Sequence, residues 1–134
     1  MKRIKILLLL IVPILLTGCA NTLKCEIETN NYTSKIKIKF ENEEPSIYKL
    51  EDKMLFDAES TDTELYYHSK YTEYNDLINN KFAVIRNHPD NVTVKIDYNF
   101  KENKTDGENK LLIKRTDTIK EATKKIESSG YTCK

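Results

Sequence analysis

The chain has 134 residues, a formal net charge of +1 at pH 7, and charged side chains at 32% of its positions. This balance argues against nucleic-acid binding, which requires a strongly basic domain. Eight tyrosines and four phenylalanines argue against a disordered chain. The length suits one domain with its own core.

The first residues have the three parts of a secretory signal peptide. Lys2, Arg3 and Lys5 precede an apolar run from Ile6 to Leu16, and small residues follow the run. The run is shorter than the roughly 20 apolar residues of a transmembrane helix. We therefore expect a cleaved leader and not a membrane-spanning anchor.

The end of this leader, Leu16-Thr17-Gly18-Cys19, resembles the lipobox of bacterial lipoproteins. In those proteins the cysteine receives a diacylglyceryl group and becomes the N-terminus after cleavage. The resemblance implies a lipoprotein signal peptide over residues 1–18, lipidation of Cys19, a lipidated tether over 19–22 and a domain over 23–134. It also implies a lipid anchor in the outer leaflet of the cytoplasmic membrane, with the domain facing outside.

Two further cysteines, Cys25 and Cys133, lie outside the leader. In an exported chain, two such cysteines are expected to form a disulfide, with their Cα atoms about 4.4–6.8 Å apart. The alternatives are two free thiols or part of a metal site. Zinc would need more cysteine or histidine ligands, and His68 and His88 have no ligand spacing.

From Leu23 the sequence alternates with a period of two, which predicts strands with one buried face. A two-residue turn at Asn30-Asn31, where asparagine tolerates positive φ, predicts a hairpin with Cys25 opposite Ile36. The inward residues of the two strands are Leu23, Cys25, Ile27, Ile36, Ile38 and Phe40.

A third strand is predicted from about Ile47 to Phe56, after the charged run Glu41–Glu44 and Pro45 end the second. Its inward residues are Tyr48, Leu50, Met54 and Phe56. Asp52 falls on the same inward parity. We therefore expect a bulge or an edge position at Asp52.

The period then becomes helical. Thr61 and Glu64 fit a capping box, and the helix is expected to end near Asn79-Asn80. The predicted core stripe consists of Tyr67, Tyr71, Tyr74 and Ile78, flanked by Leu77. Tyr66 lies off this stripe and is expected to be exposed. The alternative is that the tyrosines form a stacking platform for sugar rings.

Two more strands are predicted, over residues 82–86 and 92–100, with a turn at His88-Pro89-Asp90-Asn91 between them. An exposed loop is expected over residues 101–110. Leu111 to Ile113 returns to the core, in a conformation that the pattern does not assign.

A last helix is predicted from Thr118, with Glu121 completing its capping box and pairing with Lys125. Its expected buried stripe is Ile119, Ala122 and Ile126. Gly130 is placed to end the helix. In a Schellman motif, Tyr131 would then pack on Ile126.

Together these elements predict an α+β domain. A single antiparallel sheet of about five strands, in the order strand-strand-strand-helix-strand-strand-helix, carries both helices on its apolar face. The opposite face, which is rich in lysine, is expected to face solvent.

The whole mature chain resembles the YehR-like family of small bacterial lipoproteins. The resemblance rests on the lipobox cysteine, on Leu23-Lys24-Cys25, and on the ending from Lys125 to Lys134, KIESSGYTCK. It implies an α+β domain outside the cytoplasmic membrane. It supplies no catalytic residues.

The sequence lacks the common catalytic motifs of a Gly-x-Ser-x-Gly nucleophile elbow, a P-loop and a dinucleotide-binding glycine pattern. We therefore expect neither enzyme activity nor a cofactor. Asp57, Glu59, Asp62 and Glu64 could hold calcium, but lack the spacing of an EF-hand. The alternative is that they complement a helix dipole.

A basic stripe, Lys35, Lys37 and Lys39, could be joined by Lys95 on the open sheet face. It would contact anionic lipid headgroups or an anionic wall polymer. The alternative is an ordinary solvated face.

These features predict a non-catalytic binding or structural role at the cell envelope, anchored through lipid, with a protein or envelope polymer as partner. The alternative is an inhibitor or immunity-type module that blocks a secreted or surface protein, and a small hydrolase is a third hypothesis. A large exposed apolar patch would favour the inhibitor hypothesis, and a mixed-charge surface would favour the envelope-binder hypothesis. A deep cleft lined by histidines and carboxylates would favour the hydrolase hypothesis.

Overall fold

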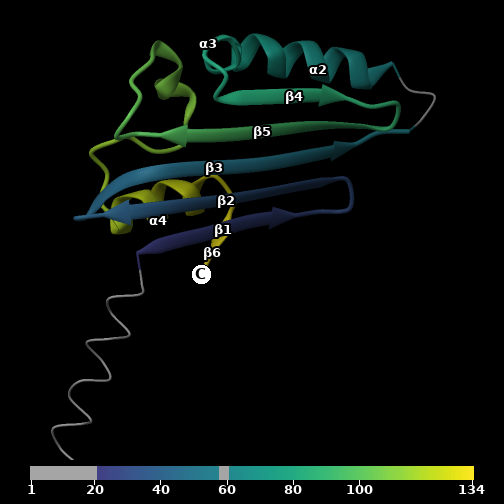
Figure 1. Ribbon diagram of the computed structural model, residues 1–134. Helices are drawn as coiled ribbons and strands as arrows, with labels where there is room; N and C mark the ends of the chain where they lie inside the picture. Colours follow the sequence, from purple (N-terminus) through teal and green to yellow (C-terminus); the bar gives the residue numbers. More distant parts are fainter. Residues whose placement is uncertain (1–20, 58–60) are drawn as a thin grey trace, which may run out of the picture.

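The computed structural model describes residues 21–57 and 61–134, which form one antiparallel sheet of six strands with helices on one face (Figure 1). The strands are β1 (Thr22–Glu28), β2 (Tyr32–Glu41), β3 (Glu44–Leu55), β4 (Ala83–Asn87), β5 (Asn91–Asn99) and β6 (Thr132–Cys133). The helices are α2 (Asp62–Glu73), α3 (Asn75–Asn79), the 3-10 helix η1 (Asp106–Lys110) and α4 (Ile119–Ser128). The leader, and Cys19 with it, lies outside the described residues.

The strands are ordered β4-β5-β3-β2-β1-β6, so β3 and β2 lie at the centre. Helices α2 and α3 run along the β4 side of the sheet, and α4 covers the half that contains β1 (Figure 1). One hydrophobic core joins the helices to the inward residues of β1 to β5. The predicted α+β class and single antiparallel sheet are confirmed. The sixth strand is the short β6.

The predicted hairpin of β1 and β2 is confirmed with its register, since Cys25 pairs with Ile36. The two-residue turn at Asn30-Asn31 is also present, since the Thr29 N–H donates to the Tyr32 carbonyl at 2.8 Å, although neither asparagine has a positive φ. That geometry occurs in the next turn, where Asn42 and Glu43 have φ angles of 51° and 65°. Two positive φ angles suit a tight hairpin, so β2 and β3 connect directly.

The predicted bulge at Asp52 is wrong. The register shift lies between Lys39 and Phe40, where Pro45 sits opposite Phe40. A proline is tolerated beside a bulge because the ladder is already interrupted there. Asp52 instead keeps regular pairing with both β2 and β5.

The tyrosine-rich helix is broken in two at Tyr74, whose φ and ψ are −104° and 19°. Its predicted N-cap, Thr61, is confirmed. The predicted capping box is wrong, because the Thr61 side chain makes no cap hydrogen bond. The Glu64 carboxylate accepts a hydrogen bond from Asn87 Nδ2 at 3.2 Å instead, which ties α2 to the end of β4.

The buried face of α2 is rotated relative to the predicted stripe. Tyr74 and Leu77 are buried, but Tyr71 is 41% exposed. Tyr66, predicted to be exposed, is half-buried, with its ring centroid 5.5 Å from that of Phe56. The buried face also includes the polar residue Thr63. A stripe drawn through apolar residues alone therefore misses the side on which α2 meets the sheet.

The connection from β5 to α4 is more ordered than the predicted exposed loop. It contains η1, in which Gly107 is buried against α3. A Cβ atom at Gly107 would lie 3.0 Å from Asp76 Cβ and 3.0 Å from Leu77 Cγ. Glycine therefore permits the close approach of η1 to α3.

After η1 the chain returns to the core, as predicted, since Leu111 and Ile113 are buried. The segment 111–113 is neither helix nor strand. Arg115 holds the connection together: its guanidinium pairs with the Glu108 carboxylate and donates to the Phe100 carbonyl at 3.1 Å.

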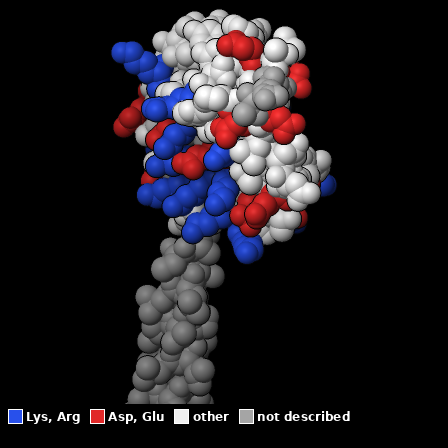
Figure 2. Space-filling model, turned by 90° about the vertical axis from the view of Figure 1, so that its right-hand side faces the viewer, with Lys and Arg blue, Asp and Glu red and all other residues white. Residues whose placement is uncertain are grey.

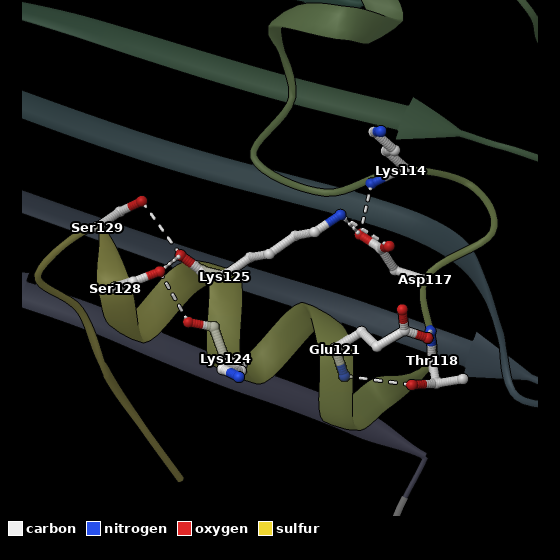
Figure 3. Close-up of polar contacts among 8 residues, drawn as sticks. All are labelled: Lys114, Asp117, Thr118, Glu121, Lys124, Lys125, Ser128 and Ser129. Atoms are coloured by element: carbon white, nitrogen blue, oxygen red, sulfur yellow. Dashed lines mark hydrogen bonds and ion pairs between the residues drawn. The ribbon is translucent and has the colours of Figure 1, made fainter.

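The predicted capping box of α4 is confirmed. The Thr118 side chain accepts from the Glu121 N–H, and the Glu121 carboxylate accepts from the Thr118 N–H, each at 3.2 Å (Figure 3). The expected pair between Glu121 and Lys125 is wrong, because Lys125 Nζ lies 2.7 Å from the buried carboxylate of Asp117 (Figure 3). Ala122 and Ile126 are fully buried, whereas Ile119 is exposed.

The predicted Schellman motif at the end of α4 is confirmed. Gly130 has a φ of 98°, its N–H donates to the Glu127 carbonyl, and the Tyr131 N–H donates to the Ile126 carbonyl. Tyr131 is buried in the same core cluster as Ile126. The motif turns the chain back toward β1.

The predicted disulfide between Cys25 and Cys133 is present. The two residues are direct partners in the antiparallel pair of β1 and β6. Their Cα atoms are 4.0 Å apart, closer than expected, because directly opposed residues of antiparallel strands approach closely. The C-terminal tail therefore lies against the first strand.

Candidate functional site

The sheet face opposite the helices is exposed and rich in lysine, and Figure 2 shows basic side chains gathered along one side of the molecule. We call this surface the lysine face. Its basic residues are Lys24, Lys35, Lys37, Lys39, Lys49, Lys53, Arg86 and Lys95, and its acidic residues are Glu26, Glu28, Glu41, Glu44, Glu51 and Asp97. The eight cations outnumber the six acids, of which Glu41 and Glu44 are paired at the β2–β3 turn.

The charges of the lysine face are not evenly mixed. Lys24 of β1 is directly opposite Lys37 of β2, and Lys37 is directly opposite Lys49 of β3. Like charges in directly opposite positions destabilise a sheet. We call Lys24, Lys37 and Lys49 the lysine row.

The neighbouring row shows what an ordinary solvated face looks like. There Lys35 lies between Glu26 and Glu51, and Glu51 is next to Lys95. The Lys95 Nζ is 3.6 Å from Glu51 Oε1. This row alternates in charge, so the same sheet contains both a compensated and an uncompensated arrangement.

Most of the lysine row has no counter-charge within ion-pair distance among the described residues. At the β5 end, Lys49 Nζ is 4.0 Å from Asp97 Oδ2, with both side chains more than half exposed. Within residues 21–57 and 61–134, no carboxylate lies within ion-pair distance of Lys24 or Lys37. Exposed pairs such as Lys49–Asp97 contribute about 0–1 kcal/mol. The row therefore keeps its positive charge available to a partner.

An open depression of about 370 Å³ lies over this part of the face. Its walls come from β1, β2, β3 and the C-terminal tail, and its lining residues are Lys24, Cys25, Glu26, Lys35, Ile36, Lys37, Lys49, Glu51, Thr132 and Lys134. Basic side chains predominate around it. The arrangement suits electrostatic contact with an anion.

The predicted basic stripe is thus part of a wider site. Lys35, Lys37 and Lys39 lie on the open face as expected. Lys95 also lies on the open face, where it forms an ion pair with Glu51. The predicted hairpin register already places Lys24 opposite Lys37. Lys49 was missed as a partner of Lys37, because the alternation of the third strand gives its exposed face but not its neighbours.

A second polar cluster lies inside the protein, around Asp52. The Ser34 hydroxyl donates to the Asp52 carboxylate. Since a serine hydroxyl has one proton, the Tyr131 hydroxyl must donate in its 2.6 Å contact with Ser34 Oγ. The cluster links Ser34 of β2, Asp52 of β3 and Tyr131 in the turn after α4. These hydrogen bonds explain how the carboxyl group of Asp52 is accommodated at the centre of the sheet.

Burial dominates the electrostatics of this cluster. It raises the pKa of Asp52 above the ordinary value of 3.8, and hydrogen bonds from Ser34 and Tyr32 only partly offset it. Burial also raises the pKa of the Tyr131 hydroxyl, which therefore remains a proton donor. These effects describe a structural network that holds the C-terminal turn on the sheet.

A raised pKa makes Asp52 a source of pH-dependent stability. In the folded protein Asp52 keeps its proton at pH values where the unfolded chain has lost it, so its contribution falls as pH rises from about 4 through its folded pKa. Asp52→Asn retains an oxygen that accepts from Ser34 but cannot ionise. We expect this variant to gain stability relative to wild type across that window and to be at least as stable at pH 7. Denaturant melts at a series of pH values would measure this, and a constant difference between the two proteins would contradict it.

The other candidate residues are not brought together. His68 lies 3.4 Å from Glu64 on the exposed side of α2, and His88 is exposed in the turn before β5. Among the residues with described positions, no group of three or more histidine, cysteine or acidic side chains could hold a metal ion. Glu59 of the acidic cluster lies outside those residues.

Exposed apolar side chains are spread over four elements. The large ones are Leu55 in β3, Leu65 and Tyr71 in α2, Val84 in β4 and Ile119 in α4. Single exposed apolar residues are common on soluble domains, whereas contiguous patches mark protein interfaces.

Across the described part of the chain, no helix combines the length and the apolar character that a membrane span requires. Comparisons with protein-family models, with curated proteins and with solved structures found no match to this chain.

Proposed function

We propose that this protein is a lipid-anchored, extracytoplasmic protein with a non-catalytic binding role at the cell envelope, and that its lysine face contacts an anionic partner. The observation that carries the binding role is the lysine row, in which three like charges stand side by side across three strands. Such a row lowers stability. Binding of an anion would offset that cost.

The anchor is proposed from the lipobox resemblance of Leu16-Thr17-Gly18-Cys19. The disulfide between Cys25 and Cys133 supports a location outside the cytoplasm, because disulfides persist in oxidising compartments. The resemblance to the YehR-like lipoproteins agrees with this location and stays a prediction.

Replacing Cys19 by alanine tests the anchor. In bacteria fed a fatty-acid analogue, we expect the full-length wild type to be labelled and Cys19→Ala to be unlabelled with its leader still attached. The chemical reason is that the thiol is the only acceptor for the diacylglyceryl group. Gel fluorescence and intact mass would report both results. Normal labelling of the variant would refute the anchor.

Neutralising the lysine row tests the binding role. The triple variant Lys24→Gln, Lys37→Gln and Lys49→Gln should bind inorganic polyphosphate at low salt at least tenfold more weakly than wild type, since a lysine near an anionic surface contributes about 1 kcal/mol. The matched control, Lys104→Gln, Lys120→Gln and Lys124→Gln, removes the same charge from exposed positions outside the lysine face. Equal weakening of the two triple variants would contradict a specific role for the row.

Stability separates this effect from misfolding. Because the row places like charges together, its neutralisation should leave the free energy of unfolding unchanged or slightly raised. Denaturant melts of both triple variants would measure this. Weaker binding together with unchanged stability would support a binding role.

A further inference from the structure

We infer that the anionic partner of the lysine face is the headgroup layer of the membrane that carries the lipid anchor. This inference rests on the proposed function, since it assumes that Cys19 is lipidated. It adds an orientation: the lysine face lies against the membrane, and the helices face outward.

The short tether supports this partner. Strand β1 begins at Thr22, three residues after Cys19. Three extended residues span at most about 10–11 Å, so the start of β1 cannot move far from the headgroups. The site is thereby held within reach of the membrane.

Lys39 and the lysine row lie toward the end of the sheet at which β1 begins. Thr22 is paired with Lys39, and the next position on the same face pairs Lys24 with Lys37. Successive positions on one face are about 7 Å apart, and neighbouring strands about 4.8 Å. Lys39 and the lysine row therefore lie within about 12 Å of Thr22, where β1 begins, a distance comparable to the screening length of about 8–10 Å in physiological salt.

The shape of the site also favours a surface over a small ligand. Its cations are spread across strands β1, β2 and β3 around an open depression. A layer of anionic headgroups can meet many such cations at once. Each lysine near the surface should strengthen the contact about fivefold.

The opposite face would then be displayed away from the membrane. Helices α2 and α4 pack on the side of the sheet that carries the core. With the lysine face down, these helices point toward the cell exterior. The lipid alone leaves the domain free to tumble on its tether, and the lysine face would restrict it to this orientation.

Residue-resolved lysine labelling tests the orientation. The mature lipidated protein, purified with its anchor, is added to preformed vesicles of phosphatidylcholine alone or of an equal mixture with phosphatidylglycerol. A membrane-impermeant amine reagent is applied, and mass spectrometry measures modification at each lysine. We expect labelling of Lys24, Lys37 and Lys49 to fall about fivefold in the anionic vesicles at low salt and to recover at high salt.

Internal controls come from Lys104, Lys120 and Lys124, whose labelling should be the same in both kinds of vesicle. The triple variant of the lysine row supplies a second control, in which Lys35 and Lys39 should lose their protection. Equal labelling of the lysine row in anionic and neutral vesicles would overturn the inference.

A third labelling condition distinguishes failure of the membrane orientation from failure of the proposed function. Inorganic polyphosphate is added to the protein in neutral vesicles. Protection by polyphosphate without protection by anionic vesicles would overturn the membrane orientation and leave a polymer-binding role standing. Protection by neither would overturn both.

Discussion

Replacing Cys25 and Cys133 together by alanine is expected to lower the free energy of unfolding by about 4–5 kcal/mol. The bridge joins residues 108 positions apart, and closing a loop of that length restricts the unfolded chain by about this much. The loss is large beside the roughly 5–15 kcal/mol of a typical domain. Denaturant melts of wild type and the double variant would measure it.

The structure shows what the bridge holds. Without it, the C-terminal tail would stay on β1 only through the short β1–β6 pairing and the hydrogen bond from the Lys134 N–H to the Lys24 carbonyl at 2.8 Å. The Schellman turn would still direct Tyr131 into the core. We therefore expect the variant to fold, with a weakened edge.

Reductant provides the matched control. Wild type under reductant should fall to the stability of the double variant, whose own stability should not respond to reductant. Alkylation of the oxidised protein, followed by mass spectrometry, should find no free thiol at Cys25 or Cys133. A loss of less than about 1 kcal/mol would refute the stabilising role, since bridges of this loop length typically contribute 2–4 kcal/mol or more.

The second large effect is expected at Tyr74. Its side chain is 7% exposed and belongs to the core cluster, so Tyr74→Ala should cost about 3–5 kcal/mol. Tyr71, three residues earlier, is 41% exposed, and Tyr71→Ala should change stability by no more than about 0.5 kcal/mol. Both changes remove the same side chain from the same region, so each controls for the other.

Denaturant melts of the two tyrosine variants would measure this contrast. Equal losses would contradict the observed rotation of α2 and would restore the stripe predicted from sequence. A small loss at both positions would place both rings at the surface, where a stacking role for the tyrosines would return.

Local sequence determined much of this fold. The alternation in β2 and β5 predicted every inward side chain from Ile36 to Phe40 and from Val92 to Phe100. The capping box at Thr118 and the Schellman motif at Gly130 were equally predictable. In each case the residues that decide the structure lie within a few positions of one another, so the chain pattern contains the whole cause.

Tertiary contacts decided the rest. Asp52 is accommodated at the centre of the sheet because Ser34 and Tyr131, far from it in sequence, supply its hydrogen-bonded surroundings. The rotation of α2 depends on its contacts with β4 and β5. Neither could be inferred from the spacing of apolar residues.

The candidate site likewise has one part that the sequence predicted and another that only the tertiary structure decided. Sequence alone placed Lys35, Lys37 and Lys39 on an exposed face, because side chains of a strand alternate between its two sides. The predicted register of the β1–β2 hairpin also set Lys24 opposite Lys37 and Glu26 opposite Lys35. Only the strand order, with β3 on the other side of β2, set Lys49 beside Lys37 and Glu51 beside Lys35. Strand neighbours are chosen by the burial of the whole apolar face against the helices, so the charge pattern of the open face depends on packing on the opposite side of the sheet.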